Sequence, residues 1–522
     1  MKKFAAIGFL VLAALCEAVG ATPEAVRKRY VLFGFEFRRN ADAQKFYDNA
    51  HLFSDAGIDG VGVYLPRKKR PDGTLSWSAM NDKFEWRYED YAADIPLYRE
   101  GFRKAGLTHN FLKEFFCAPK KHIGWDDDAA WARVARTLAL TARIAREMGC
   151  RGLCVDHEDY YRTDQFRRRA GEPPYDELAA IVRKRARDSF AAAFREFPDA
   201  ELFFYWFLGG DERLVTNSDP MGVARSGGNL WPAFANGILD ALPPKAKIVD
   251  ADEWGYYHPE KEYFDKMVRL RKVQCLGLVA PENREKYKMQ TSMGFGLYTD
   301  MYINPKMDKS GKPVAFYRPP TDGSRLKTFA PLLQAATDAA DEYVWFWNEK
   351  VQWIKWNPPP AEKGVVVDRT LDDFLPGLRN LCDATRGVRG FVARREKELA
   401  AKGLLPELAR PVLSNDCCTA TVSGLKTGEF YLFRADVKGD AKATVYPFLG
   451  GKTLDWWDEM GKIYSIEFSP AGKDGFRRAE ALVRIPEGVD RYDFKVVSMP
   501  PPGGKLEIGK MSIKRLFWFE PD

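Results

Sequence analysis

The sequence predicts an α/β fold, a (β/α)8 or TIM barrel followed by an antiparallel β-sandwich. Short β-type runs alternate with helical segments eight times between residues 30 and 348, the pattern of a parallel sheet built from βα units. Eight units favour a closed barrel over an open sheet. Beyond residue 412 the chain changes to short alternating strands separated by Gly, Pro and Asp, which is typical of a separate sandwich.

The individual elements follow from the periodicity of the apolar residues. We expect barrel strands at residues 30–37, 57–65, 110–116, 151–156, 201–208, 247–252, 292–302 and 342–348. Helices are expected at 42–56, 90–105, 127–148, 175–197, 259–278 and 325–340, with two more at 371–383 and 388–402. The sandwich strands are expected at 429–437, 443–448, 463–469, 477–485, 491–499 and 505–517.

The first residues have the pattern of a cleaved export signal. Lys2 and Lys3 precede an apolar run at 4–15, and small residues lie before Thr22. We therefore expect a signal peptide at 1–21 and a secreted or periplasmic protein. The domains that follow are a barrel at 22–403, a linker at 404–411 and a sandwich at 412–522. No later apolar run is long enough to span a bilayer, so no membrane span is expected.

Charge and motif content narrow the function classes. The chain has 80 Lys and Arg against 73 Asp and Glu, a formal net charge of +7. This mild excess is compatible with an anionic polysaccharide substrate or simply with a solvated surface. The basic residues form no patch interleaved with aromatic residues, so a nucleic-acid partner is not expected. CxxC and HExxH motifs are absent from the sequence and its five histidines are scattered, so neither a metal nor another cofactor is expected.

The stretch 149–161, GCRGLCVDHEDYY, ends an apolar run in acids and tyrosines. Side chains alternate along a strand, so Asp156 and Glu158 share one face and should point inward at the strand's carboxyl end. Burying carboxylates there is costly unless they are paired or used, and in parallel barrels this end carries the site. The stretch is therefore the first candidate site. The other interpretation is a solvated junction between a strand and a loop.

A second stretch, 247–259 or KIVDADEWGYYHP, repeats this pattern after the sixth expected strand. It supplies Asp252 and Glu253, followed by Trp254 and Tyr257. Two groups of acids that face each other across a barrel mouth suit cleavage of a glycosidic bond. One carboxylic acid protonates the leaving oxygen while another carboxylate attacks or activates water.

Further candidates either lie at strand positions expected to face the barrel interior or follow the end of a strand. Aromatic rings offer apolar faces to the C–H faces of sugars, although each ring could instead pack in the core or at the rim. The candidates for substrate binding are Glu36, Tyr64, Tyr160, Trp206, Trp254, Tyr257, Asp300, Trp347 and Glu349.

Residues 30–400 resemble the (β/α)8 glycoside hydrolases. The D-x-E at Asp156 and Glu158 is similar to the end of the strand-four motif of family 18 chitinases, although Arg151 and Cys154 stand where that family has further aspartates. This resemblance implies that Glu158 is a general acid and that Asp156 orients an acetamido group. An acid pair from the fourth and sixth strands also looks like the α-galactosidase type, which would select Asp156 and Asp252.

The C-terminal region resembles the carbohydrate-binding β-sandwiches often fused to such enzymes. This resemblance is one of pattern, and it implies a role in holding polymeric substrate. Trp456 and Trp457 would then form the sugar platform, although the same rings could belong to the core.

The leading prediction is a secreted glycoside hydrolase that cleaves a poly- or oligosaccharide. Glu158 would be the general acid/base and Glu253 the second carboxylate, with Asp156 and Asp252 as supporting or substitute acids. A barrel protein that has lost a catalytic carboxylate and only binds glycans is one alternative.

A polysaccharide lyase is the other alternative. It would need a neutralised uronate carboxylate and a basic side chain that removes a proton. The residues nominated for that base are Tyr160, His157 and Lys113.

Overall fold

The computed structural model describes residues 27–34, 36–37, 42–66, 78–80, 85–118, 121–258, 260–303, 310, 317–358, 366–388, 390–414, 417–449, 452–453, 464–466, 468–498 and 507–521. Two sequence predictions lie outside these residues. They are the export signal at 1–21 and the sugar platform at Trp456 and Trp457.

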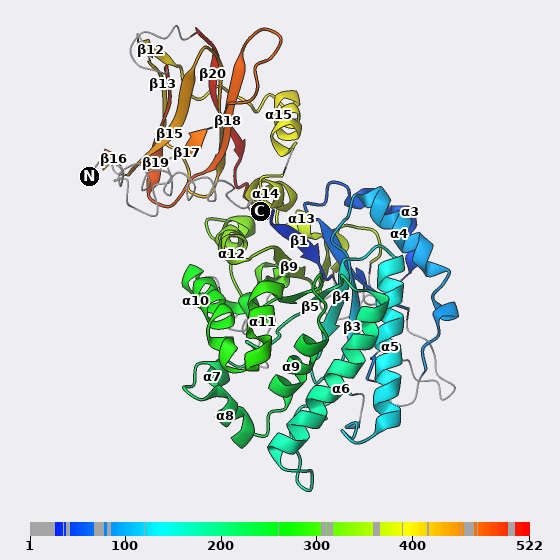
Figure 1. Cartoon of the computed structure of the whole chain (residues 1–522). Helices are drawn as coiled ribbons and strands as arrows, with labels where there is room; N and C mark the ends of the chain where they lie inside the picture. Colours follow the sequence, from blue (N-terminus) through cyan, green and yellow to red (C-terminus); the bar gives the residue numbers. More distant parts are fainter. Residues whose placement is uncertain are drawn as a thin grey trace, which may run out of the picture.

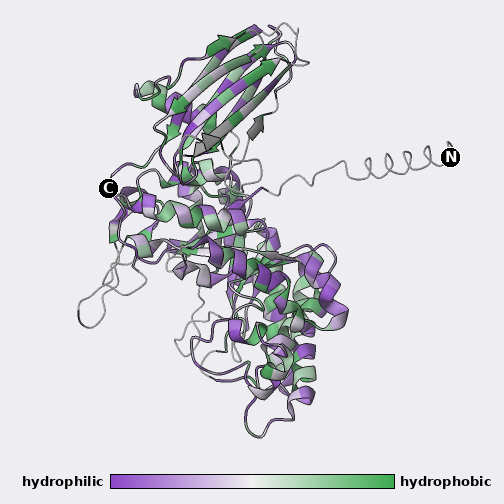
Figure 2. Cartoon of the chain, turned by 90° about the vertical axis from the view of Figure 1, so that its left-hand side faces the viewer, coloured by the Kyte–Doolittle hydropathy of each residue, from purple (hydrophilic) through white to green (hydrophobic). Residues whose placement is uncertain are grey.

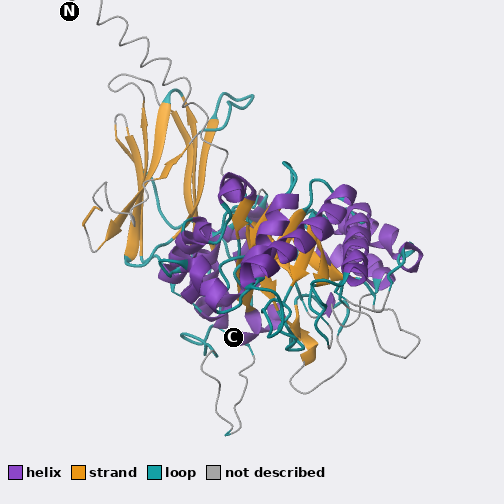
Figure 3. Ribbon diagram, turned by 60° about the horizontal axis from the view of Figure 1, so that its bottom comes forward, coloured by secondary structure: helices purple, strands orange, loops and turns teal. Residues whose placement is uncertain are grey.

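The first domain is a parallel barrel surrounded by helices (Figures 1 and 3). Its strands pair in the order β7-β6-β5-β4-β3-β2-β1-β9-β8, and every pair is parallel. The bounds are β1 Arg29–Leu32, β2 Gly60–Tyr64, β3 Phe111–Phe115, β4 Gly152–Asp156, β5 Glu201–Phe204, β6 Lys247–Asp250, β7 Thr291–Met293, β8 Phe295–Tyr298 and β9 Tyr343–Trp347.

The barrel closes through a strand that is broken at one residue. β7 and β8 are consecutive in the chain and separated by Gly294, whose N–H donates to the Asp250 carbonyl at 2.9 Å. β7 pairs with β6 and β8 pairs with β9, so the two halves together complete the ring. The (β/α)8 barrel predicted from the eight repeated units is confirmed.

Helices cover the outside of the strands. The larger ones are α3 Ala43–Asn49, α4 Asp94–Ala105, α5 Asp128–Glu147, α6 Tyr175–Glu196, α9 Trp231–Ala241, α10 Lys261–Lys272 and α12 Arg325–Ala339. Shorter ones are α7 Glu212–Val215, α8 Pro220–Ser226 and α11 Arg284–Gln290. Among the helices of the described residues, none combines the length and apolar character needed to cross a membrane.

Helix α9 is the one large barrel helix that the sequence did not predict. All its residues from Pro232 to Leu239 are buried, so it has no polar face whose spacing would reveal a helix. Gly237 allows α9 to approach α6 closely, because a Cβ there would lie 2.2 Å from the Arg183 carbonyl oxygen.

Aromatic rings fill the lower part of the barrel interior. The Phe33 ring lies 6.4, 5.2 and 5.6 Å from the rings of Phe111, Phe203 and Trp345, which come from different sides of the barrel. A Cβ on Gly62 would lie 2.0 Å from the Phe33 ring. This contact confirms the inward face predicted for the second strand. The packed rings form a floor, so the open part of the lumen lies at the carboxyl ends of the strands.

The second domain consists of two antiparallel sheets. The larger has the order β12-β13-β19-β15-β16, with β17 on β15, and the smaller has the order β18-β14-β20. Hydrophilic and hydrophobic residues alternate along the strands (Figure 2). The bounds are β12 Val412–Ser414, β13 Cys417–Ser423, β14 Phe430–Lys438, β15 Ala441–Leu449, β16 Lys452–Thr453, β17 Tyr464–Ile466, β18 Arg477–Arg484, β19 Val489–Ser498 and β20 Glu507–Phe517. The predicted β-sandwich is confirmed.

Strand β13 was not predicted, because its buried face carries small side chains. Cys418, Ala420 and Val422 are buried while Thr and Ser alternate with them, which gives only a weak apolar signal.

The sandwich packs on the helices that follow the barrel (Figure 1). The elements between the barrel and the sandwich are the strands β10 Val351–Gln352 and β11 Val366–Thr370 and the helices α13 Leu371–Phe374, α14 Leu378–Thr385 and α15 Phe391–Ala401. Of these, α14 and α15 contact the sandwich strand β20. Phe430 and Phe517 of the sandwich belong to the barrel's hydrophobic core. Arg434 donates to both carboxylate oxygens of Glu396 on α15, at 2.9 and 2.7 Å. The two domains therefore share apolar packing as well as an ion pair.

We predict that Phe517→Ala destabilises both domains. Truncating a buried Phe costs about 3–5 kcal/mol, and Phe517 is 1% exposed in the shared core. Phe494→Ala is the matched control, because Phe494 is equally buried but packs only within the sandwich. Denaturant unfolding followed by probes in each domain should show a weakened barrel only for Phe517→Ala. Equal barrel stability in the two variants would contradict the shared core.

Candidate active site

A buried ion pair lies at the carboxyl ends of β3 and β4, the region called the mouth below. Lys113 Nζ lies 2.9 Å from the Asp156 carboxylate, and their side chains are 2% and 0% exposed. Asp156 also accepts the backbone N–H of Glu158 at 3.2 Å and the hydroxyl of Tyr160 at 3.1 Å. These donors give the buried carboxylate the partners that its burial requires.

Lys113 is enclosed by aromatic rings as well as paired with Asp156. Burial alone would lower the pKa of Lys113, but the charge and hydrogen bond of Asp156, together with Tyr64 and Cys154, outweigh it and raise the pKa above its usual value. The ammonium group therefore stays charged. Its Nζ lies 4.4–5.5 Å from the ring centroids of Tyr64, Phe115, Tyr205 and Trp347.

Tyr160 connects the two acids of the first stretch. Its single O–H group lies within hydrogen-bond distance of both carboxylates and is shared between Glu158 and Asp156. Burial, and then the charges of Asp156 and Glu158, raise the pKa of Tyr160 far above its usual range, so the hydroxyl keeps its proton. Glu158 is thus a partly exposed carboxylate with a fixed donor beside it.

The second stretch places its aspartates away from the mouth, unlike the expectation that they face the first acid cluster. Asp252 is 0% exposed and accepts from Arg271 at 2.7 Å and from Tyr263 at 2.9 Å, and both donors belong to α10 outside the barrel. Asp250 accepts from the same guanidinium at 3.0 Å. The side chains point outward because Arg271 is a buried cation that needs both anions.

The backbone at Asp252 is strained, and the strain sets the direction of the next residue. Asp252 has φ 22°, a conformation that L residues rarely adopt. Its carbonyl accepts the Gly296 N–H at 3.1 Å, while the Glu253 N–H donates to the Tyr205 carbonyl at 3.0 Å. Anchored on both sides, the chain leaves β6 with Glu253 facing the opposite way from Asp252.

Glu253 is the acid whose protonation departs most clearly from normal at the mouth. Burial, and then the charges of Glu158 and Asp156, raise the pKa of Glu253 to about 9. The effect of those charges also shows that Glu253 lies near the first acid stretch. At neutral pH Glu253 therefore carries a proton.

The remaining predicted acids hold the loop that follows β9. Glu36 is buried and accepts the Trp353 N–H at 3.1 Å. Asp300 accepts the N–H groups of Glu349 and of the next residue, at 2.9 and 2.8 Å. Burial is the main cause that raises the pKa of both Glu36 and Asp300 to about 7. Glu349 accepts from the neighbouring tyrosine and tryptophan side chains of β8 and β9.

The predicted aromatic residues divide into exposed and enclosed ones. Tyr160, Trp254 and Tyr257 are 45%, 49% and 37% exposed, as expected for rings that could meet a ligand. Tyr64 and Trp347 surround Lys113 inside the mouth. The Trp206 side chain instead lies beside His157, with ring centroids 5.4 Å apart.

Several residues of the site were missed or given another role from the sequence. Lys113 was nominated only as a lyase base, although a lysine between Phe111 and Phe115 on an inward face signals a buried charge. Tyr205 and Arg271 carry no local signal, since their partners lie on other elements. Among the residues that the structure describes, there is no group of three or more His, Cys, Asp or Glu side chains suited to a metal ion.

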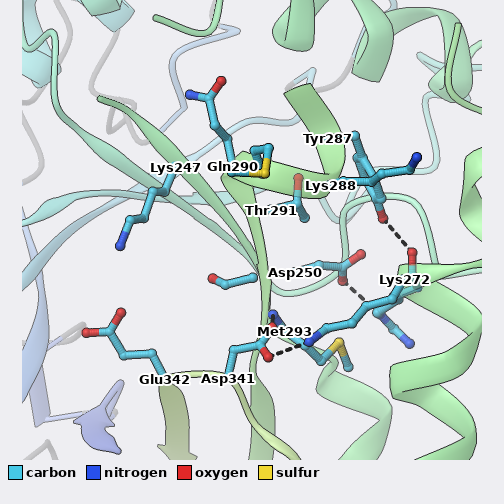
Figure 4. Close-up of a pocket in the computed structure, with 13 residues that line it drawn as sticks. Lys247, Asp250, Lys272, Tyr287, Lys288, Gln290, Thr291, Met293, Asp341 and Glu342 are labelled. Atoms are coloured by element: carbon cyan, nitrogen blue, oxygen red, sulfur yellow. Dashed lines mark hydrogen bonds and ion pairs between the residues drawn. The ribbon is translucent and has the colours of Figure 1, made fainter. Parts of the chain in front are cut away.

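A cavity of about 480 Å³ lies elsewhere, at the amino ends of the strands (Figure 4). Its wall includes Lys247 and Thr291, the first residues of β6 and β7, and Glu342, which precedes β9. Sites in parallel barrels occur at the carboxyl ends. We therefore treat this cavity as separate from the mouth.

Comparison with known proteins finds only remote matches among solved structures. No family model and no curated protein matches the chain. A GH113 β-1,4-mannanase is 11% identical over 70% of this chain and 100% of its own, with a TM-score of 0.32. An endocellulase from Pyrococcus horikoshii is 10% identical over 70% and 93%, with a TM-score of 0.35.

Two other matches cover less than two thirds of the solved chain. The match to a Prevotella bryantii endo-β-mannanase/endo-β-glucanase is 10% identical over 62% of this chain and 45% of that one, with a TM-score of 0.34. The match to a tailspike protein of bacteriophage CBA120 is 16% identical over 21% and 18%, with a TM-score of 0.16. At these values the roles of residues must be argued from the site itself.

We predict that Lys113→Met destabilises the fold by about 3–5 kcal/mol, because it leaves the buried Asp156 carboxylate without its cation. Adding Asp156→Asn removes that stranded charge and should recover part of the loss. Guanidinium unfolding of the two single variants and the double variant measures the coupling. A double variant no more stable than Lys113→Met would contradict the pairing.

Proposed function

We propose that this protein is a glycoside hydrolase that acts on a neutral glycan, with Glu253 as proton donor and Glu158 as the ionised carboxylate. One observation carries the proposal. Two carboxyl groups lie near each other at the mouth, and the environment keeps Glu253 protonated while Tyr160 donates a hydrogen bond to Glu158. Cleavage of a glycosidic bond requires one carboxylic acid and one carboxylate.

In the proposed reaction Glu253 gives its proton to the leaving glycosidic oxygen as the bond to the anomeric carbon breaks. Glu158 either attacks that carbon or removes a proton from the attacking water. Asp156 stays paired with Lys113, and its charge adds to burial and to the charge of Glu158 in favouring the protonated form of Glu253. The negative field also suits the positive charge that develops on the sugar ring.

This assignment differs from the role that the family 18 resemblance implies for Glu158. The resemblance makes Glu158 the acid, whereas the electrostatics favour Glu253 for that role. The α-galactosidase-type pair of Asp156 and Asp252 is less favoured, because each carboxylate is fully buried against a cation. Both aspartates are better suited to holding the neighbouring glutamates in place.

The lyase alternative lacks a suitable base among the three nominated residues. Tyr160 holds its proton because burial and then the charges of Asp156 and Glu158 raise its pKa, and Lys113 holds its proton because the interactions led by Asp156 outweigh its burial. His157 is stacked on Trp231, with ring centroids 4.0 Å apart, and burial lowers its pKa to about 4, which makes it a weak base. An anionic substrate would also meet the negative charge of this acid cluster.

Three further expectations belong to the same proposal. The sandwich would help to hold polymeric substrate, the substrate would be a poly- or oligosaccharide, and residues 1–21 would direct export. The shared core supports a structural role for the sandwich in addition to any binding role. Sequencing the amino terminus of the exported protein tests the cleavage near Thr22.

We predict that Glu253→Gln lowers turnover of natural glycans by about 10²–10⁴-fold, because glutamine cannot supply the proton. Aryl glycosides with good leaving groups should lose much less. Glu158→Gln is the matched comparison and should abolish activity on both substrate types, because the attacking or water-activating group is gone. The two roles are reversed if Glu253→Gln retains turnover of natural glycans. They are also reversed if Glu158→Gln is the variant that loses turnover of natural glycans while keeping turnover of aryl glycosides.

We also predict that kcat/KM falls at high pH because Glu253 loses its proton, which gives the pH profile a basic limb. The acid acts only when protonated, and its pKa is raised to about 9, so kcat/KM should hold through neutral pH and fall as the pH passes about 9. Initial rates on a natural glycan, whose leaving group needs the proton, measure this fall across the same pH range. In Glu253→Gln the limb should disappear, and an unchanged limb in that variant would assign it to another group.

A further inference from the structure

Two hollows beside the mouth form one groove. One has a volume of about 270 Å³ and the other about 450 Å³. Their walls share Phe166, Asp211, Leu214 and Asn229, so the hollows are contiguous. Most wall residues lie in the connections after β4 and β5, including helices α8 and α9, and Leu278 comes from the connection after β6. Strand β4 leads to the Glu158 stretch and β5 leads to Tyr205.

The inner end of the groove is aromatic. His157 lies flat on Trp231 with an interplanar angle of 3°, and Trp206 meets His157 at 66°. His157 lies between Asp156 and Glu158 in the chain, so the aromatic wall adjoins the proposed site in the sequence. The Gly210 backbone packs on Trp206, since a Cβ there would lie 2.6 Å from the indole ring. The half-buried Trp206 is therefore fixed in orientation.

The outer end is polar and held in an unusual backbone conformation. Asp159 accepts the N–H groups of Thr163 and Asp164, at 2.9 and 2.7 Å. Arg162 and Asp164 have φ values of 53° and 50°, a strained arrangement for residues other than glycine. Strain of this kind is often kept where a loop must hold a binding surface.

We propose that this groove binds the sugar units of the glycan that lie beyond the bond at Glu158 and Glu253. Aromatic walls pack on the C–H faces of sugar rings, and carboxylate and amide groups accept or donate hydrogen bonds to hydroxyls. The groove combines both, with Trp206 at one end and Asp159, Asp211 and Asn229 toward the other. The inference rests on the proposed function, since it extends the same substrate, and it makes the protein selective for chains over single sugars.

Chain-length dependence of binding tests the groove. Titration calorimetry on full-length Glu158→Gln, the variant expected to abolish turnover, uses neutral gluco- and manno-oligosaccharides from disaccharide to hexasaccharide as probes. Adding Trp206→Ala should lower the affinity for the longest ligand that binds by about tenfold and leave the affinity for the disaccharide unchanged. Val223→Trp fills the outer hollow from an exposed position and should act in the same direction. Trp518→Ala in the sandwich is the matched control and should change neither affinity.

The outcomes separate the groove from the proposed reaction. Equal weakening of short and long ligands, no effect of both groove variants, or failure of every probe to bind would overturn the groove. If Trp206→Ala does not fold, the chain-length dependence of affinity in Val223→Trp tests the groove instead. If the unaltered protein hydrolyses no glycan while the groove variants lose affinity for long chains, the groove stands and the hydrolase proposal fails. If the unaltered protein hydrolyses glycans but the groove variants weaken short and long ligands equally, the hydrolase proposal stands and the groove proposal fails.

Discussion

The ion pair of Lys113 and Asp156 governs the electrostatics of the barrel mouth. Both side chains are almost fully buried, so removing either partner would leave the other charge unpaired in the interior. Asp156 accepts the Tyr160 hydroxyl, and its charge adds to burial and to the charge of Glu158 in raising the pKa of Glu253. The protonation state of the acid proposed as donor thus depends on a residue two strands away.

A second buried cation, which pairs with two aspartates, fixes the backbone outside the barrel. Arg271 holds Asp250 and Asp252 against α10, and the strained residue Asp252 directly precedes Glu253. In each stretch a buried, cation-bound aspartate lies one or two residues before a glutamate at the mouth. The aspartates fix the backbone, and the glutamates are left to face the lumen.

The sequence was informative about everything that depends on local periodicity. The barrel, the sandwich and the inward faces at Gly62 and Asp156 follow from alternation and from the positions of charged residues. The outward turn of Asp252 could not be predicted, because it depends on Arg271, which comes from a different element of the fold. Helix α9 was hidden for a related reason, since complete burial removes the polar face that marks a helix. Identifying Glu253 as a protonated acid required the distances that only the folded chain defines.

The break at Gly294 makes the length of its strand invariant. The residues on either side belong to two different pairings, β7 with β6 and β8 with β9, so the chain is in register with both neighbours at once. Removing or adding one residue here would turn every following side chain of β8 to the opposite face of the sheet. Tyr298, which lies 5.5 Å from Tyr256 at the mouth, would then point into the helix layer. Related chains with this barrel should vary in the loops around the strand while keeping its residue count unchanged.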